Sequence, residues 1–396
     1  MREGERKVFN MRDVAIVSIA RTPVGRGIKG SFRDTRPDTL GGIAFAEAVI
    51  RAKIDPKEID DVVVGCAFPE GEQGMNPSRV VATLAGIPYE TPTMTVNRFC
   101  SSGVQSLQVA ANQIRVGESD IVAAGGIESM SMVPMGGNKF SANPYLMAER
   151  PEFYTPMGIT AEIVAKRFEI TRQMQDEMAY RSHIRGSAAI KDGKFKDEIV
   201  PVSTKVYEAS GVKAVTVTDD EGPRADTTLE ALAKLKPAFD SQGTVTAGNT
   251  SQVSDGAGAA ILMADEVAKK KGLAPLAYIR GYAVAGVAPE VMGIGPVPAV
   301  RKLLQKTGLK ISDIDLVELN EAFAAQGAYC IRELGLDVDK VNVNGGAIAL
   351  GHPLGATGTV LTAKIVYELR RRKARYGIVT MCIGGGMGAA MLFERA

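Results

Sequence analysis

The stretch that decides the fold is Asn97-Arg98-Phe99-Cys100-Ser101-Ser102-Gly103. The run Thr93–Val96 before it has strand-like composition. After it, apolar residues recur at the three- and four-residue spacing of a buried helix face: Val104, Leu107, Ala111 and Ile114. Cys100 is therefore expected at a strand-to-helix turn, where Ser101 and Ser102 can cap the helix.

This position suits Cys100 for covalent catalysis. The free amides and positive end of a helix favour a thiolate and lower its pKa, and the thiolate is the nucleophilic form of cysteine. The alternative is a buried core cysteine, which is common for a single Cys in an arbitrary chain. The rest of the chain decides between the two.

Composition excludes several classes of protein. The chain has 396 residues, enough for two or three domains, and a net charge of +2 with 23% charged residues, so we expect no nucleic-acid partner. The four cysteines form no CxxC pair and have no metal-ligand spacing, which predicts free thiols and no metal site. They are Cys66, Cys100, Cys330 and Cys382.

No targeting or membrane segment is expected. Met1–Arg12 is charged and lacks the apolar stretch of a signal peptide, and its two glutamates argue against a mitochondrial transit peptide. The ending Phe393–Ala396 is no peroxisomal signal, and no run of about 18 apolar residues exists for a membrane span. A cytoplasmic location is the resulting prediction.

Strands and helices alternate along the chain, which predicts an α/β fold with buried sheets. The second half repeats the first: Ile59–Val63 resembles Ile314–Val317, and Gly256–Leu262 resembles Gly386–Leu392. In this repeat Gly103 and Gly358 are each expected to open a helix. We predict a duplicated α/β unit.

One half carries an insertion, from about Ser129 to Ser251, between two strands that should be neighbours. It includes a loop-to-helix entry at Met157 and a helix from Arg172 to Ile190, which Thr171 can cap. The closing segment Thr244–Ser254 is rich in Gly, Ser, Thr and Asn. It is equally compatible with a cover over a ligand site and with a surface elaboration.

Polar groups of the second half are expected at the same end of the sheet as Cys100. Asn320 follows a predicted strand, His352 precedes a predicted helix, and Cys382 follows a strand and leads into Gly384-Gly385-Gly386. A Cys–His pair can form a nucleophilic thiolate, a second Cys can carry a proton, and glycine amides can stabilise an oxyanion. Taken singly, these residues are ordinary loop and core residues; their convergence favours catalysis.

Four motifs resemble the signatures of the thiolase family, in the family's order. They are the nucleophile stretch 97–103, Asn320-Glu321-Ala322-Phe323, the run from Gly345 to Gly355 that includes Gly351-His352-Pro353, and Cys382-Ile383-Gly384-Gly385-Gly386-Met387-Gly388. The resemblance covers the whole chain. It implies the duplicated, layered αβαβα thiolase fold with an inserted loop domain: residues 1–128 with 252–273, the insertion 129–251, and residues 274–396.

The resemblance implies an acyltransferase with the following roles. Cys100 is acylated, His352 activates its thiol, and Cys382 is the acid/base at the second carbon of the substrate. Asn320, through a water, and His352 form one oxyanion hole, while the amides of Cys100 and Gly384 form the other.

By the same resemblance, coenzyme A is a substrate, no cofactor is tightly bound, and CoA lies against Ser251, Ala247, Met157 and Arg224. His183 has no family role and is expected to be an ordinary surface or structural residue. A homodimer or homotetramer is expected, with a β-oxidation enzyme as a possible further partner.

The sequence favours one subtype, a 3-ketoacyl-CoA thiolase of fatty-acid breakdown. Pro156-Met157-Gly158 lacks the histidine common before Met-Gly in short-chain acetoacetyl-CoA thiolases, and Val291–Pro296 is similar to the degradative enzymes. The alternatives are a biosynthetic acetyl-CoA acetyltransferase and a non-catalytic acyl-CoA-binding scaffold. A ketoacyl-carrier-protein synthase fits less well, because Cys382 has no role in that chemistry.

Overall fold

The computed structural model describes residues 11–396, so nearly all of the N-terminal stretch used for the targeting prediction lies outside the described residues. The elements that surround the nucleophile stretch in the first half are β1 (Val14–Arg21), β2 (Gly25–Arg26), α1 (Pro37–Ala52), β3 (Asp61–Gly65), α2 (Pro77–Leu84), β4 (Thr93–Val96), α3 (Ser102–Val116), β5 (Ile121–Ser129), β8 (Ser254–Ala264) and α8 (Asp265–Lys270).

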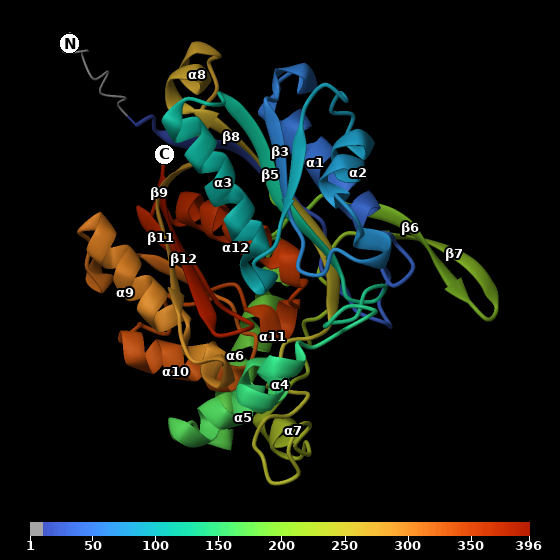
Figure 1. Ribbon diagram of the computed structural model, residues 1–396, viewed down its shortest axis with the longest axis vertical. Coiled ribbons are helices and arrows are strands. Elements are labelled where there is room, and N and C mark those ends of the chain that lie inside the picture. The colour runs from blue at the N-terminus through green and yellow to red at the C-terminus, as the bar shows by residue number, and fades with distance from the viewer. Residues whose placement is uncertain (1–10) are drawn as a thin grey trace.

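The rest of the chain supplies an insertion and the second half (Figure 1). The insertion holds α4 (Pro144–Glu149), α5 (Met157–Arg167), α6 (Arg172–Lys191), β6 (Val202–Glu208), β7 (Gly211–Val217) and α7 (Leu229–Ala233). The second half holds β9 (Ala277–Gly286), α9 (Pro296–Thr307), β10 (Leu316–Leu319), α10 (Ala324–Leu334), α11 (Ala347–Leu350), α12 (Leu354–Arg372), β11 (Tyr376–Ile383) and β12 (Met387–Arg395).

The two halves have matching sheets that are joined into one. The strand order is β10-β11-β12-β9-β1-β8-β5-β3-β4, with β2 paired to β8. Each half has parallel strands that continue into an antiparallel pair, β5·β8 in the first half and β11·β12 in the second. The junction is short, since β1 and β9 pair only at Ala15–Tyr278 and Ile16–Ala277.

Five layers result, as the predicted αβαβα fold requires. Helix α1 packs on the outer face of the first sheet through Leu40 and Phe45. Helices α3 and α12 lie between the two halves of the sheet, where Leu107 and Ile365 share one core (Figure 1). Leu303 of α9 belongs to the core on the outer face of the second half.

Glycines let the two central helices touch. A Cβ built on Gly103 would lie 2.8 Å from the carbonyl oxygen of Gly355, and one built on Gly358 would lie 2.2 Å from the amide nitrogen of Val104. The prediction that Gly358 opens a helix is therefore wrong. Helix α12 begins at Leu354, and Gly358 lies inside it because no side chain fits at the crossing.

The insertion leaves and re-enters between adjacent strands, since β5 and β8 pair directly, with Gly126 opposite Gly258. Thr171 caps α6 as predicted, because its hydroxyl accepts a hydrogen bond from the amide of Met174 at 3.2 Å. Buried Arg21 of β1 fixes the insertion to the sheet through ion pairs with Glu198 and Asp220.

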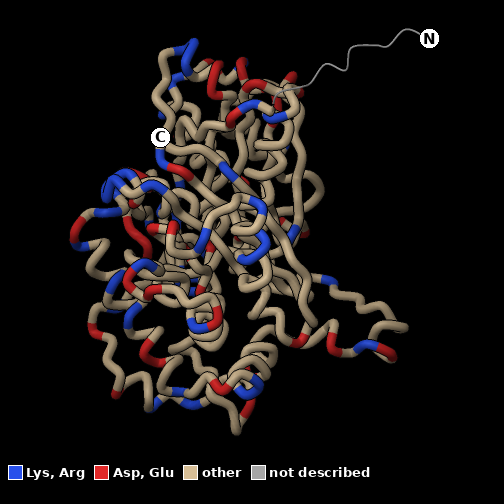
Figure 2. Tube along the Cα trace, turned by 90° about the vertical axis from the view of Figure 1, so that its left-hand side faces the viewer, with Lys and Arg blue, Asp and Glu red and all other residues tan. Residues whose placement is uncertain are grey.

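Charged side chains of both signs are interspersed along the chain, as expected from the net charge of +2 (Figure 2). Between residues 11 and 396, no helix is both long and apolar enough to cross a bilayer.

Candidate active site

The turn that carries Cys100 is held in an unusual backbone conformation. Cys100 lies in a 3₁₀ turn (Phe99–Ser101) between β4 and α3. Phe99 has a φ of +42°, a region that favours glycine, and its amide donates to Asn97 Oδ1 at 2.8 Å. Strain of this kind persists only where the surrounding structure enforces it, so the position of Cys100 is fixed.

The capping predicted for the two serines is wrong. The hydroxyls of Ser101 and Ser102 donate to the carbonyl oxygens of Arg98 and Phe99, and Ser102 Oγ also accepts from the amide of Arg98. The serines therefore close the turn itself, because the 3₁₀ turn has already bent the chain back before α3 begins.

The pKa of Cys100 also differs from the prediction. Burial raises the pKa of the Cys100 thiol to about 11, while hydrogen bonds from the amides of Gly384 and Cys100 act in the opposite direction. At neutral pH the residue is thus a thiol that needs a base, and the helix start does not by itself make a thiolate. Gly384 nonetheless lies beside this turn, since a Cβ built on it would be 4.0 Å from the Phe99 ring.

Cys382 lies at the end of β11 and is fully buried. Burial raises the pKa of its thiol well above the ordinary value, and the neighbouring Cys100 and Cys330 raise that pKa further. Among the four free cysteines, only Cys100 is partly exposed.

His352 is oriented by hydrogen bonds at both ring nitrogens. Its Nδ1 lies 2.6 Å from Thr357 Oγ1, whose hydroxyl donates to the Pro353 carbonyl oxygen at 2.9 Å. Nδ1 must therefore carry the proton, which leaves Nε2 as the acceptor, 3.2 Å from Asn320 Nδ2. Burial lowers the pKa of His352 to about 4, so the imidazole is a neutral base at neutral pH.

Strand pairing brings the His352–Asn320 pair towards the cysteines. The amide of Asn320 donates to the carbonyl oxygen of Thr380, two residues before Cys382. The first residue of β8 contributes as well, since Ser254 Oγ accepts from the amide of His352 at 3.0 Å. The segment Thr244–Ser254 thus contacts the histidine loop through its last residue, and its role as a cover over a ligand stays a prediction. Thr357 and Ser254 carried no signal in the sequence.

Two of the four predicted CoA contacts share a cavity. Arg224 and Ala247 line a space of about 200 Å³ together with His183, Leu232 and Gln252. His183 is not a surface residue: it is buried, its Nδ1 accepts from the amide of Arg224 at 3.2 Å, and burial lowers its pKa to about 4.

The other two predicted CoA contacts lie nearer the cysteines. The amide of Ser251 donates to the carbonyl oxygen of Ala322, and Met157 begins α5. A Cβ built on Gly384 would lie 3.5 Å from Met157 Sδ. These two residues do not line the cavity of Arg224 and Ala247, and they border the catalytic cluster.

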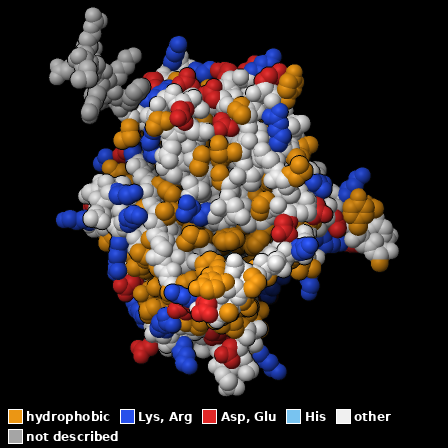
Figure 3. Space-filling view, viewed as in Figure 1, with side chains coloured by type: hydrophobic (Ala, Val, Ile, Leu, Met, Phe, Trp, Pro, Cys, Tyr) orange, Lys and Arg blue, Asp and Glu red, His pale blue; other side chains and the backbone are white. Residues whose placement is uncertain are grey.

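The surroundings of Cys382 are apolar. It packs in a cluster with Ala161, Val245, Met292, Ala322 and Phe323, and Met157 packs against the same cluster. Further apolar side chains of the insertion are exposed near α4, where Figure 3 shows hydrophobic side chains gathered on this face of the molecule. They are Met135, Phe140, Tyr145, Met147 and Phe153.

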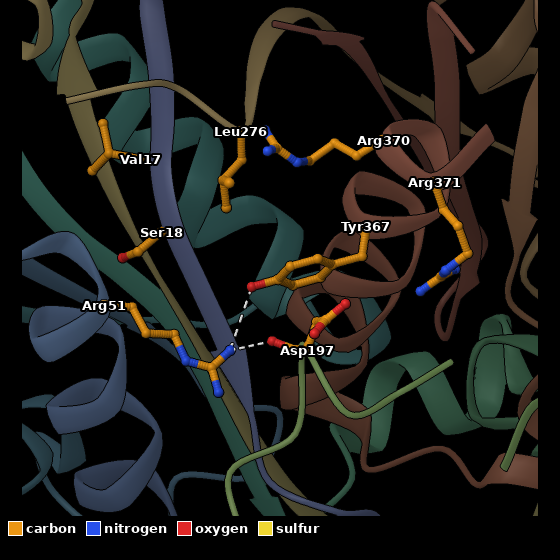
Figure 4. Close-up of a pocket in the computed structure, with 8 residues that line it drawn as sticks. All are labelled: Val17, Ser18, Arg51, Asp197, Leu276, Tyr367, Arg370 and Arg371. Atoms are coloured by element: carbon orange, nitrogen blue, oxygen red, sulfur yellow. Dashed lines mark hydrogen bonds between the residues drawn. The ribbon is translucent and has the colours of Figure 1, made fainter. Parts of the chain in front are cut away.

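A larger cavity, of about 650 Å³, is not this site (Figure 4). It lies at the C-terminal end of α12, beside Arg370, whereas His352 precedes the N-terminal end of this 19-residue helix, about 28 Å away. In it, Arg51 donates to Tyr367 Oη and to the carbonyl oxygen of Asp197, which ties α1, α12 and the insertion together.

Comparisons with known proteins identify the family to which the chain is similar. Residues 14–266 match the family description "Thiolase, N-terminal domain" and residues 273–395 match "Thiolase, C-terminal domain". The chain is 54% identical to the 3-ketoacyl-CoA thiolase of Bacillus subtilis over 97% of its length and 100% of the relative. It is 47% identical to the peroxisomal 3-ketoacyl-CoA thiolase A of Mus musculus, over 96% of this chain and 91% of that one.

Two solved structures have the same fold, and each match covers 98% of this chain and 100% of the other. The Bacillus anthracis acetyl-CoA acetyltransferase aligns with a TM-score of 0.90 at 43% identity, and human mitochondrial 3-ketoacyl-CoA thiolase with 0.89 at 42%. The fold therefore does not separate the two subtypes. The chain belongs to the thiolase family of acyltransferases.

Proposed function

We propose that the protein is a 3-ketoacyl-CoA thiolase, which uses CoA to cleave a 3-ketoacyl-CoA into acetyl-CoA and a shortened acyl-CoA in fatty-acid breakdown. The observation that carries this proposal is that three parts of the chain meet: the Cys100 turn, the Cys382–Gly384 end of β11, and the His352–Asn320 pair. A Cβ built on Gly384 would lie 4.0 Å from the Phe99 ring, and Asn320 bonds to both His352 and the carbonyl oxygen of Thr380. The substrate follows from the names of relatives in the bacterium and the mouse.

In the first step, His352 Nε2 takes the proton of Cys100, and the sulfur attacks the 3-keto carbon. The developing oxyanion is held by the amides of Cys100 and Gly384. The bond between the second and third carbons then breaks, and its electron pair stays on the acetyl-CoA fragment as an enolate.

The enolate must be stabilised at its oxygen and protonated at its second carbon. Its oxygen is stabilised by His352, which now carries a proton at Nε2, and by a water held on Asn320; among the described residues, Asn320 Oδ1 has no hydrogen-bond partner. The thiol of Cys382 protonates the second carbon, and the resulting thiolate takes the proton of an incoming CoA. The CoA sulfur then attacks the acyl carbon, the bond to the Cys100 sulfur breaks, and the Cys100 thiolate takes back the proton held on His352 Nε2. The cycle thereby restores both cysteines and the neutral histidine.

The apolar cluster around Cys382 favours the degradative subtype over an acetyl-CoA acetyltransferase, because a longer acyl tail requires an apolar wall. Met157, Met292 and Phe323 supply such side chains. Methionine adapts to ligands of different length.

Chain length is the experiment that tests this subtype. We expect kcat/KM for thiolysis to rise from a four-carbon to an eight-carbon 3-ketoacyl-CoA, because each methylene that is buried contributes about 0.8 kcal/mol. The CoA part is the same in both substrates, so the ratio reports on the acyl pocket alone. A sharp fall in kcat/KM with length would move the assignment to the biosynthetic acetyltransferase.

For CoA itself we propose the cavity of Arg224, Ala247 and His183, with Ser251 and Met157 along the path to Cys100. A cation at the cavity suits the phosphates of CoA. Replacing Arg224 by Gln should raise KM for CoA and leave kcat nearly unchanged; an unchanged KM would remove Arg224 from the CoA site.

We also propose a homodimer formed through β4, the edge strand of the first half. An unpaired edge next to exposed apolar side chains favours pairing with a second copy, and Met94 on β4 and Leu84 at the end of α2 are exposed. Met94→Lys should shift the sedimentation coefficient to that of a monomer; a wild-type monomer would contradict the proposal.

The remaining assignments are proposals of the same kind. Residues 1–128 with 252–273, 129–251 and 274–396 are the proposed structural units, supported by the direct pairing of β5 with β8. A cytoplasmic location is supported by four free cysteines, and cell fractionation tests it. Co-purification with other enzymes of fatty-acid breakdown tests the multienzyme partner.

A further inference from the structure

The duplication gives the catalytic positions counterparts in the other half of the chain. Gly258 of β8 and Gly388 of β12 are equivalent in the repeated Gly-x-Gly-Ala-Ala run. Because Gly126 pairs with Gly258 and Cys382 pairs with Gly388, Gly126 is the counterpart of Cys382. Two residues further on, Glu128 is the counterpart of Gly384.

The helix starts correspond in the same way. Gly103 and Gly358 are equivalent, because each packs against the helix of the other. Cys100 lies three residues before Gly103, and Gly355 lies three residues before Gly358, so Gly355 is the counterpart of Cys100. In one half Gly384 lies beside the Cys100 turn, where a Cβ built on it would be 4.0 Å from the Phe99 ring. In the other half the Glu128 carboxylate meets the Gly355 amide at 2.8 Å. The position equivalent to the Gly384–Cys100 contact is thus occupied by the side chain of Glu128.

The backbone is closely packed at that second position. A Cβ built on Gly126 would lie 2.0 Å from the carbonyl oxygen of Gly355, and one on Gly355 would lie 2.9 Å from Glu128 Oε2. Glu128 is fully buried. Its oxygens accept from the amides of Gly355 and Ala67 and from Gln73 Nε2. All of these partners are donors, so they favour the ionised carboxylate and oppose burial, which raises the pKa of Glu128 above its ordinary value.

Two of the three partners of Glu128, Ala67 and Gly355, lead to the active site. The carbonyl oxygen of Ala67 accepts from Asn97 Nδ2 at 2.9 Å, and the ring of the next residue, Phe68, packs 5.9 Å from that of Phe99. On the other side, Gly355 lies three residues after His352, in the first turn of α12. A single carboxylate therefore joins the turn of Cys100 to the loop of His352.

We propose that Glu128 is a positioning residue for the thiolase reaction: its carboxylate fills the closed counterpart of the oxyanion hole and holds the Cys100 turn and the His352 loop in register. The role rests on the proposed function, because it acts through Cys100 and His352.

The test is chemical rescue of Glu128→Ala. The variant keeps Cβ, and acetate supplies the missing carbon and carboxylate. We expect kcat for thiolysis of acetoacetyl-CoA to fall ~10²-fold, as for a small misplacement of reacting groups, and acetate to restore at least tenfold of it with saturation. Acetamide, which has the same shape without the charge, should restore nothing.

Asp60→Ala is the matched control. The Asp60 carboxylate also accepts from two backbone amides, those of Asp120 and Ile121, but at the start of β5, far from Cys100. We expect its kcat to stay near wild type with and without acetate. The wild type is assayed for thiolysis in the same series. An inactive wild type would contradict the proposed function, whereas an active wild type with no effect of the Glu128 substitutions would contradict only the role of Glu128.

Glu128→Gln keeps the test decisive if the alanine variant does not fold. The NH₂ group of the new glutamine would face Gln73 Nε2, so two donors would meet and kcat should fall. The variant also loses the negative charge that raises the pKa of Cys100. The pH profile for alkylation of Cys100 should therefore shift to lower pH. The proposal is overturned if Glu128→Gln has the wild-type kcat and an unshifted alkylation profile. It is also overturned if acetate and acetamide rescue Glu128→Ala equally, or if a folded Glu128→Ala is not rescued by acetate.

Discussion

Replacing Cys382 by serine should slow hydrogen–deuterium exchange at the methyl group of acetyl-CoA by ~10²–10⁴-fold, the usual cost of losing a positioned acid/base. The hydroxyl is a far weaker acid/base than the thiol. Transfer of acetyl from acetyl-CoA to Cys100 requires no carbanion and should fall much less. Both rates are measured in deuterated buffer on the same preparation, exchange by NMR and transfer by protein mass.

Cys330→Ser is the control for this substitution. Cys330 is also a fully buried thiol, and its sulfur donates to the carbonyl oxygen of Gly293, but it lies in the core of the second half. Both half-reactions should survive in it. If exchange and acetylation fall by the same factor in Cys382→Ser, Cys382 shapes the nucleophile instead, and the proposed division of labour is wrong.

Replacing His352 by glutamine should slow both half-reactions, also by ~10²–10⁴-fold. Glutamine can hydrogen-bond to Asn320 but cannot take the proton of Cys100. The pKa of Cys100 is about 11, so without a base the thiolate forms only by direct ionisation. In the variant, the rate of acetylation should then rise about tenfold per pH unit towards pH 11.

The wild type should behave differently over the same range. The pKa of His352 is about 4, so the base is neutral and available at every pH above this value, and acetylation should be nearly flat between pH 6 and 9. Acetylation of the glutamine variant at the wild-type rate, with exchange alone lost, would show that His352 is not the base for Cys100.

Much of the fold was predictable because local sequence patterns determine its strands and helix ends. The strand before Cys100, the cap at Thr171 and the duplicated Gly-x-Gly-Ala-Ala strands follow from composition and spacing. The joining of the two sheets through β1 and β9 was not predictable, since only two residue pairs form it. The start of α12 was misplaced because Gly358 serves a contact with α3, which no local pattern encodes.

In the candidate site, too, the residues in local motifs were predictable and the contacts made by distant segments were not. Cys100, His352, Cys382 and Asn320 stand in recognisable motifs, but the groups that orient them come from elsewhere in the chain. Ser254, for example, reaches His352 across 98 residues. The raised pKa of Cys100 follows from burial, which depends on the packing of the whole domain and outweighs the helix start.

The most direct test of the central claim is to locate the acyl group. The protein is incubated with acetyl-CoA and no second substrate, and its mass is measured before and after digestion. We predict one acetyl group per chain, on Cys100. It should be absent from Cys100→Ala, and alkylation at neutral pH should likewise label Cys100 ahead of the buried Cys66 and Cys330. Acetyl on another residue, or no acetylated enzyme at all, would contradict the account.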